Sequence, residues 1–166
     1  MKRWLKIFLF CISSLTLISW DRATKDLAKE YLKDKENISY FHDLVRLQYA
    51  ENTGAALNLG DSLSKTAGFW LLSMLPLAFL LLLFAYTVNR STEKSFRKMF
   101  LFALIFAGGM GNILDRIFFD RHVTDFMIIG FKGIHTGIFN FADVCVTAGA
   151  ILLIFFYREK KMDPIA

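Results

Sequence analysis

The segment AGFWLLSMLPLAFLLLLFAYTV, from Ala67 to Val88, decides the fold class because it carries no charged side chain. A helix needs about 20 predominantly apolar residues to cross the hydrocarbon layer of a bilayer, and this segment is long enough. The chain of 166 residues is 55% hydrophobic and contains 18 phenylalanines but only two prolines, which is typical of membrane proteins. The segment therefore predicts a transmembrane helix.

Three further segments also predict transmembrane helices, although less clearly. The first carries Lys6 and is bounded by Trp4 and Trp20, whose rings suit the membrane interface. It could instead be a cleaved secretory signal, but no small-x-small site follows it, and Asp21 and Arg22 continue a helical pattern. We expect an all-α polytopic membrane protein, a single membrane-embedded domain over residues 1–166. Its four transmembrane helices have approximate boundaries 4–20, 67–88, 98–117 and 138–157.

Basic residues indicate how these helices are oriented. Ten of the 20 lysines and arginines lie in three short segments, 1–6, 89–98 and 158–166. Cytoplasmic loops are enriched in such residues, so we expect both termini in the cytoplasm. Seven of the other ten lie in the long loop after the first span, so charge favours this orientation only moderately. The net charge of +5 indicates contact with anionic lipid headgroups, and no nucleic acid partner is expected.

The loop between the first two spans, residues 21–66, is expected to be a folded element on the outer surface. Acids and bases alternate from Asp21 to Asn37 with the spacing of an amphipathic helical extension. From Leu44 to Tyr49 apolar and polar residues alternate as in a half-buried strand. A turn at 52–54 follows. These features predict a small extracytoplasmic β-sheet element between the first two spans. A second apolar run, Phe126–Ile129, is too short to span and predicts an interfacial strand or a dip into the membrane surface.

Two aspartates are the strongest candidates for chemistry. An ionisable group at mid-membrane costs about 2.5 to 3.5 kcal/mol on insertion scales, so Asp143, about 6 Å inside the fourth span with Asn140 on the same face, indicates a functional site. The alternative is an acid that only supports helix packing. Asp125 lies in the outer segment that leads to the same membrane face. Two adjacent carboxyl groups tend to share one proton, so one can accept a proton from water while the other donates.

A polar group at the outer end of the third span is a second candidate. Asn112, Asp115 and Arg116 fall at i, i+3 and i+4 and therefore share one helix face. Asp115 and Arg116 are expected to offset each other's cost of burial, and Asn112 and Arg116 to position a substrate or a carboxylate. Small residues just before this group predict close helix packing. They are Gly108, Gly109 and Gly111.

Cysteines and histidines offer little competing chemistry. Cys11 and Cys145 both fall in predicted spans and are expected to serve in packing. His42, His122 and His135 lack metal-ligand spacing, so neither a metal ion nor another cofactor is expected. A thiol peptidase built on Cys145 is disfavoured because the histidines lie outside the spans.

Five short blocks, spread over most of the chain, carry a family resemblance. They are DRATK at 21–25, NTGAA at 52–56, GGMGNILDR at 108–116, VTDF at 123–126 and FNFAD at 139–143. Any one block alone would be a weak signal. Together, in this order, and with four predicted spans, they resemble the bacterial lipoprotein signal peptidases (signal peptidase II).

The resemblance implies an aspartic endopeptidase of the bacterial inner membrane with its active site at the extracytoplasmic face. Such enzymes remove the signal peptide from diacylglyceryl-modified prolipoproteins by cleaving just before the lipidated cysteine. The matching positions imply that Asp125 and Asp143 are the catalytic residues. Supporting or substrate-binding roles are implied for Asp21, Lys25, Asn52, Gly54, Asn112, Asp115, Arg116 and Asn140.

This sequence departs from the family pattern at two places. The family usually has an aromatic residue and then often a serine where this chain has Leu57 and Asn58, and a doubled valine where it has Thr124. The first difference bears on packing over the substrate, and the second is conservative.

Two other function classes fit parts of the pattern. A small proton-coupled transporter could use intramembrane aspartates as a proton path, although the second span contains no acid or histidine. A small assembly subunit would tolerate the loss of both aspartates. For the peptidase, the expected partners are the prolipoprotein and membrane lipid, and the expected state is a monomer.

Overall fold

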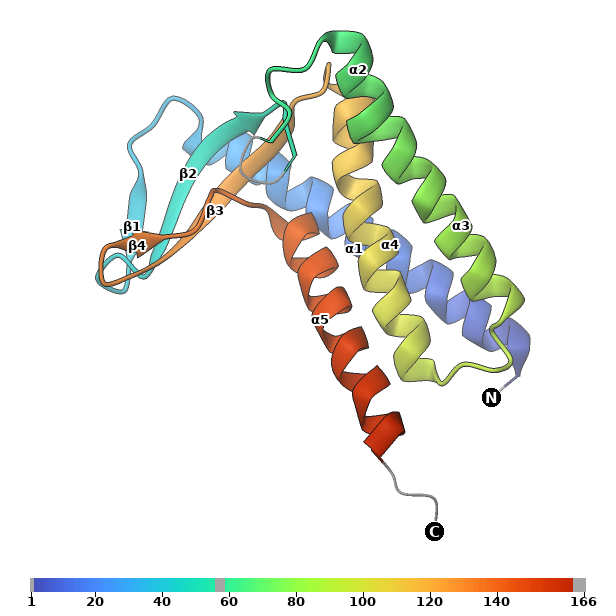
Figure 1. Cartoon of the computed structure of the whole chain (residues 1–166). Helices are drawn as coiled ribbons and strands as arrows, with labels where there is room; N and C mark the ends of the chain where they lie inside the picture. Colours follow the sequence, from blue (N-terminus) through green and yellow to red (C-terminus); the bar gives the residue numbers. More distant parts are fainter. Residues whose placement is uncertain (1, 56–58, 163–166) are drawn as a thin grey trace.

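A computed structural model describes residues 2–55 and 59–162, and the side chains of its last helix as far as residue 156 (Figure 1). Expectations for Ala56, Leu57 and Asn58, and for the side chains of the basic segment 158–166, lie outside the described residues. The elements, in chain order, are α1 (Arg3–Leu32), β1 (Ile38–Tyr40), β2 (Val45–Asn52), α2 (Lys65–Phe69), η2 (Trp70–Met74), α3 (Leu75–Asn89), α4 (Phe96–Phe118), β3 (Val123–Phe131), β4 (Ile134–His135) and α5 (Phe141–Met162).

Long apolar helices make up most of the fold. Helix α1, helix α4 and the run Lys65–Asn89, which includes the π-helical turn η2, are each long and apolar enough to cross a membrane. The apolar part of α5, Phe141–Phe156, is shorter. Helix α4 lies between α3 and α5 in Figure 1 and packs against α1, α3 and α5. The helical membrane architecture expected from the sequence is therefore present, with three to four apolar helices.

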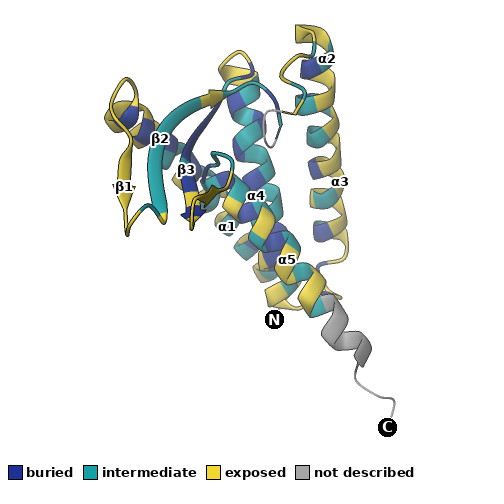
Figure 2. Ribbon diagram, turned by 60° about the vertical axis from the view of Figure 1, so that its left-hand side comes forward, coloured by how far each residue is buried: buried dark blue, intermediate teal, exposed yellow. Residues whose placement is uncertain are grey.

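Large apolar side chains cover the outside of this bundle, as the exposed positions on α3 illustrate (Figure 2). Phe79 is 60% exposed and Leu82 is 70% exposed. Soluble monomers rarely expose a continuous apolar surface of this kind, whereas lipid covers it at no cost in a membrane. Inside the bundle, Phe10 packs against Met99 and Phe102.

Helix α1 continues without a break beyond its apolar half. Its C-terminal half buries Asp21, Lys25, Ala28 and Leu32, which are three or four residues apart and so lie on one face. The predicted amphipathic extension after the first span is confirmed, although the helix ends at Leu32.

A four-stranded antiparallel sheet, in the order β1-β2-β3-β4, lies beside the C-terminal half of α1 (Figure 1). The predicted strand at 44–49 is β2, and the predicted apolar run at 126–129 lies within β3. The expectation that the sheet lies between the first two spans was incomplete, because β3 and β4 come from the segment between α4 and α5. Strand β2 needs a hydrogen-bonding partner on each side, and β3 supplies one, with Val45 opposite Ile129 and Asn52 opposite Val123.

The glycines of α4 allow neighbouring helices to come close, as predicted. A Cβ atom on Gly108 would collide with the backbone of α5 at the Ala142 carbonyl, and one on Gly111 would collide with the carboxylate of Asp21 on α1. Gly109 faces Leu80 of α3. The consequence is that α1, α4 and α5 converge at the polar residues of α4.

Candidate active site

Asp143 lies in the first turn of α5, where its orientation is set by reciprocal helix capping. The side-chain oxygen of Asn140 accepts a hydrogen bond from the backbone N–H of Asp143 at 3.0 Å, and the Asp143 Oδ2 accepts one from the backbone N–H of Asn140 at 3.0 Å. This is the geometry of a capping box, built here from Asn and Asp. A carboxylate in the first turn also interacts favourably with the helix dipole. Asp143 is therefore held by the start of its own helix.

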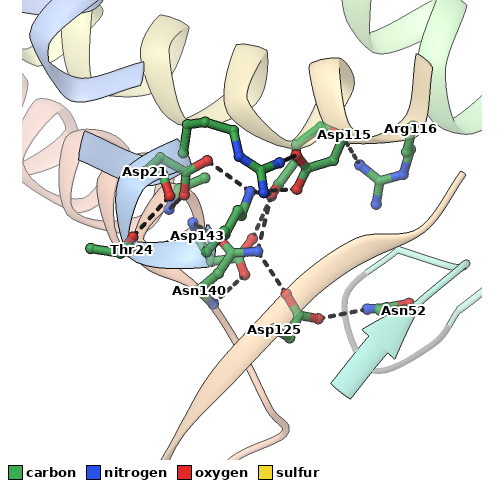
Figure 3. A network of polar contacts seen from close by, with 12 residues as sticks. Asp21, Thr24, Asn52, Asp115, Arg116, Asp125, Asn140 and Asp143 are labelled. Carbon is green, nitrogen blue, oxygen red and sulfur yellow. Dashed lines mark hydrogen bonds and ion pairs between the residues drawn. The ribbon is translucent and has the colours of Figure 1, made fainter. Parts of the chain in front are cut away.

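Asp125 reaches the same place from β3 (Figure 3). Its side chain is buried, and each oxygen accepts one hydrogen bond from an amide. Asn140 Nδ2 donates to Oδ1 at 2.6 Å, and Asn52 Nδ2 donates to Oδ2 at 3.1 Å. Since Asn140 also caps the helix that carries Asp143, one fully buried asparagine joins the two candidate catalytic acids.

The amide groups around the pair can point only one way. Asn112 Oδ1 accepts from the ammonium of Lys25 at 3.0 Å, and an ammonium can only donate. The Nδ2 of Asn112 must therefore face Asp143 Oδ1, to which it donates at 2.8 Å. Asn52 is fixed in the same manner, because its Oδ1 accepts from the backbone N–H of Gly54. Hydrogen-bond donors are thus directed at both carboxyl groups.

Behind Asn112 lies a buried charge cluster on α1 and α4. Lys25 is 0% exposed, and its ammonium lies 2.7 Å from Asp21 Oδ2 and 2.8 Å from Asp115 Oδ2. The other oxygen of Asp21 accepts from the backbone N–H of Ala142 at 2.9 Å, near the start of α5. A buried charge is tolerated only when it is paired, and here each member has a partner.

One expectation for this cluster holds only in part. Asp115 and Arg116 attract each other through their charges, but no salt bridge joins them among the described residues, because adjacent helix residues point in different directions. Asp115 pairs instead with Lys25 and with Arg22, whose Nη1 lies 3.0 Å from Asp115 Oδ1. Arg116 donates to the carbonyls of Asn112 at 3.2 Å and of Gly54 at 2.7 Å.

A cavity of about 870 Å³ opens onto the two aspartates. Its charged and amide lining residues are Asn52, Asn112, Arg116, Asp125 and Asp143, and Thr136 and Thr147 add hydroxyl groups. Most of the remaining lining is apolar and includes Leu72, Ile113, Val146 and Ile151. Ligand sites typically combine an apolar wall with a few convergent polar groups. The cavity can therefore hold an apolar ligand with one end against the carboxyl pair.

The environment of Asp125 favours its protonated form. Burial raises the pKa of the Asp125 carboxyl to about 6, and the negative charge of Asp143 adds to this effect, while the hydrogen bonds from Asn52 and Asn140 oppose it. Asp125 therefore holds a proton at pH values at which an ordinary aspartate has lost it. Such a group can act as a general acid.

Other candidate chemistries are not supported by the arrangement. Cys145 is buried, and His135 lies on β4, where its Nε2 is 3.1 Å from Asp43. Among the side chains described, those of residues 2–55 and 59–156, no three His, Cys, Asp or Glu gather as metal ligands would.

All ten residues singled out in the sequence belong to this one network or line its cavity, while two arginines were missed. Arg22 was interpreted only as part of the helical pattern after the first span, yet it pairs with Asp26 and with Asp115. Arg121 is buried and donates to the carbonyl of Thr53 at 3.0 Å. The sequence offered no signal for Arg121, because its partners are backbone carbonyls far away in the chain.

The sequence of this chain matches a known protein family. The family model described as signal peptidase (SPase) II matches residues 13–158, which is most of the chain and includes every residue of the network. The chain belongs to the signal peptidase II family. It is therefore a protease of a bacterial membrane-protein family, and the transporter alternative has no support from these matches.

Individual relatives in the signal peptidase II family align over nearly the full length. The lipoprotein signal peptidase of Clostridium tetani is 37% identical over 86% of this chain and 91% of its own. That of Chlorobium phaeobacteroides is 34% identical over 93% and 92%, and that of Borreliella afzelii is 32% identical over 98% and 96%.

A solved structure has the same fold. It is described as a bacterial membrane enzyme determined by the in meso method at 2.3 Å resolution, and it superposes with a TM-score of 0.78. The alignment covers 95% of this chain and 92% of the other, at 23% identity.

Proposed function

We propose that this signal peptidase II is an aspartic endopeptidase that removes the signal peptide from diacylglyceryl-modified prolipoproteins. The bond cleaved is the one just N-terminal to the lipidated cysteine. The observation that carries the proposal is the joining of Asp125 and Asp143 through Asn140 at one end of an apolar cavity. Relatives 31% to 37% identical are named lipoprotein signal peptidases, which supports the substrate class.

In the proposed mechanism the two carboxyl groups divide the proton transfers. The ionised Asp143 takes a proton from a water molecule as the water oxygen attacks the scissile carbonyl carbon. Protonated Asp125 donates its proton to the developing oxyanion. As the C–N bond breaks, Asp143 gives the proton taken from water to the leaving amine of the lipidated cysteine, and Asp125 regains its proton from the hydroxyl group as the new carboxyl group forms. The donors from Asn112 and from the Asn140 backbone keep Asp143 aligned for this step.

The cavity supports an acyl-bearing substrate. Its lining is mostly apolar, and residues from α3, α4 and α5 contribute to it, so a lipid chain or an apolar signal helix would lose little on entering from the bilayer. Asn52 and Arg116 lie at its polar end and are proposed to bind the peptide backbone. The remaining residues of the network, Asp21, Lys25, Gly54 and Asp115, are proposed to support this end of the site.

The proposed function is tested with a lipidated and an unlipidated form of one prolipoprotein. The purified chain in liposomes is expected to cut only the diacylglyceryl form, and mass spectrometry is expected to locate the cut before the modified cysteine. A folded protein that cuts neither form, or that cuts elsewhere, would contradict the proposal.

The proposal includes four spans, with α5 as the fourth, both termini in the cytoplasm and the site at the outer face. Single-cysteine variants lacking Cys11 and Cys145 test this arrangement. Ser62→Cys is expected to react with a membrane-impermeant maleimide in intact cells, whereas Lys2→Cys is expected to react only after lysis. Both positions are exposed, so access differs only through the membrane. The opposite labelling pattern would reverse the orientation.

The pH dependence follows from Asp125. If its proton is required, kcat/KM decreases as the pH rises through the pKa of Asp125, about 6, because the general acid is then ionised. The groups that set this value are Asp143 on α5, Lys25 on α1 and the two asparagine donors. A pH profile of kcat/KM from pH 4.5 to 9 measures the alkaline limb.

Asn52→Ala provides the matched variant for this profile. The hydrogen bond from the Asn52 amide lowers the pKa of Asp125, so removing the amide is expected to move the alkaline limb of kcat/KM to higher pH. A limb that stays in place or moves to lower pH would contradict the assignment of Asp125 as the acid.

A further inference from the structure

The connection between α4 and β3 has an unusual backbone. Asp120 has φ +47° and Arg121 has φ +73°, so two successive residues other than glycine adopt the left-handed conformation. Residues other than Gly, Asn and Asp rarely adopt this backbone conformation, because their Cβ atom crowds the backbone. Strain of this kind persists where surrounding contacts enforce it, and it often marks a functional segment.

Backbone hydrogen bonds from Arg121 N–H to the Arg116 carbonyl and from His122 N–H to the Phe119 carbonyl close this turn, and the side chain of Arg121 adds contacts to other segments. It is only 9% exposed. Its Nη2 donates to the carbonyl of Thr53 at 3.0 Å, and its Nη1 lies 3.5 Å from the carbonyl of Leu63. The guanidinium also lies directly against Gly68 of α2, where a methyl group would overlap it. Arg121 thus joins the end of α4, the turn after β2 and the start of the second apolar helix.

The turn that Arg121 holds directly follows a residue that donates a hydrogen bond to Asp125. Thr53 follows Asn52, the residue that donates to Asp125 Oδ2 at 3.1 Å. Arg116 holds the next carbonyl, that of Gly54, at 2.7 Å. Two arginines from the outer end of α4 and its connection therefore fix consecutive carbonyls of this turn. The position of the Asn52 amide depends on where those carbonyls are held.

We propose that Arg121 is a positioning residue that holds Asn52 against Asp125. The inference rests on the proposed function, because it assigns Asp125 a role in cleavage. Arg121 contacts neither carboxyl group and acts through the Thr53 carbonyl. Among the described residues, its side-chain hydrogen-bond acceptors are backbone carbonyls. The contact therefore depends on the two-pronged shape of the guanidinium and on the absence of a side chain at Gly68.

Arg121→Gly tests the proposal without adding backbone strain, because glycine adopts φ +73° freely. In liposomes, kcat on the lipidated prolipoprotein is expected to fall about 10- to 100-fold, the scale of a small misplacement in an active site. The alkaline limb of kcat/KM is expected to shift to higher pH, as in Asn52→Ala.

Lys132→Gly is the matched control. Lys132 also has a cationic side chain and a left-handed backbone, with φ +50°, but it is exposed at the β3–β4 turn. Its replacement relieves the same kind of strain and is expected to leave kcat and the pH profile unchanged. Equal effects of the two glycine substitutions on kcat would overturn the proposal.

Gly68→Ala tests the same contact by changing the residue against which the Arg121 guanidinium packs. The added methyl group displaces the guanidinium, so this variant alone is expected to lower kcat to a similar degree. In the Arg121→Gly background, Gly68→Ala is expected to have no further effect. Effects that multiply in the double variant would show that Gly68 and Arg121 act independently and would contradict the proposal.

Hydrogen exchange separates this inference from the proposed function. Amides of residues 53–55 are expected to exchange faster in Arg121→Gly than in wild type or Lys132→Gly, whether or not the substrate is cleaved. Unchanged exchange there would overturn the role of Arg121 even if the wild-type chain cleaves prolipoprotein. If Arg121→Gly exchanges faster but the wild-type chain cleaves no prolipoprotein, the role of Arg121 in holding the turn is supported and the proposed function fails.

Discussion

Asp143→Asn is expected to reduce cleavage of a lipidated prolipoprotein by about 10²- to 10⁴-fold, the usual contribution of a positioned acid or base. The asparagine side chain keeps the size of the carboxyl group but cannot accept a proton from water. Asp125→Asn is expected to have an effect of the same order, because it removes the proton donor. Initial rates per folded enzyme, in the same liposomes as wild type, measure both effects.

A matched control shows that the loss is chemical. Asp34 is exposed in the turn after α1, and its left-handed backbone, with φ +59°, also suits asparagine. Asp34→Asn is expected to cleave at the wild-type rate. Thermal unfolding in detergent checks that Asp125→Asn and Asp143→Asn remain folded. A folded variant at either position with wild-type turnover would remove that residue from the mechanism.

Lys25→Met is expected to lower the free energy of unfolding by about 3–5 kcal/mol, the cost of removing one partner from a buried ion pair. Asp21 would lose its only cation within hydrogen-bonding distance among the described residues, while Asp115 would keep Arg22. Asn112 would also lose one of the two donors to its Oδ1 and would keep only that from Asn140 Nδ2. Unfolding by denaturant in mixed micelles, followed by helix content, measures the change.

Lys29→Met is the control for this substitution, because Lys29 lies one turn further along α1 and is exposed. It is expected to change stability by less than about 0.5 kcal/mol. Adding Asp21→Asn to Lys25→Met is expected to restore part of the loss, since the amide oxygen can still accept from the Ala142 N–H without an unpaired charge. Equal stability of Lys25→Met and Lys29→Met would show that the cluster contributes nothing.

The helices and the catalytic candidates could be predicted because their signals are local. The uncharged run 67–88 predicts a span by its length alone. Asp143 is conspicuous as an acid near the start of an otherwise apolar segment, and Asn140 lies three residues before it. The capping arrangement between these two residues is likewise a property of adjacent positions.

The features of the structure that could not be predicted from the sequence depend on contacts between distant segments. The pairing of β2 with β3 joins Asn52 to Val123, and no local pattern shows which strands pair. Asp115 was assigned to Arg116 because they are neighbours in sequence, whereas packing of α1 against α4 pairs it with Lys25. Arg121 binds carbonyl groups, which every residue has, so its partners leave no trace in the sequence.

The measurement that tests the shared role of the two aspartates most directly is the initial cleavage rate of four proteins on one lipidated prolipoprotein. They are wild type, Asp125→Asn, Asp143→Asn and the double variant, in liposomes of one composition. Since the acids act as a unit, the three variants are expected to share one residual rate, with the double variant no slower than either single variant. Two partial losses that multiply in the double variant, or wild-type turnover in either single variant, would contradict the proposal that Asp125 and Asp143 act together.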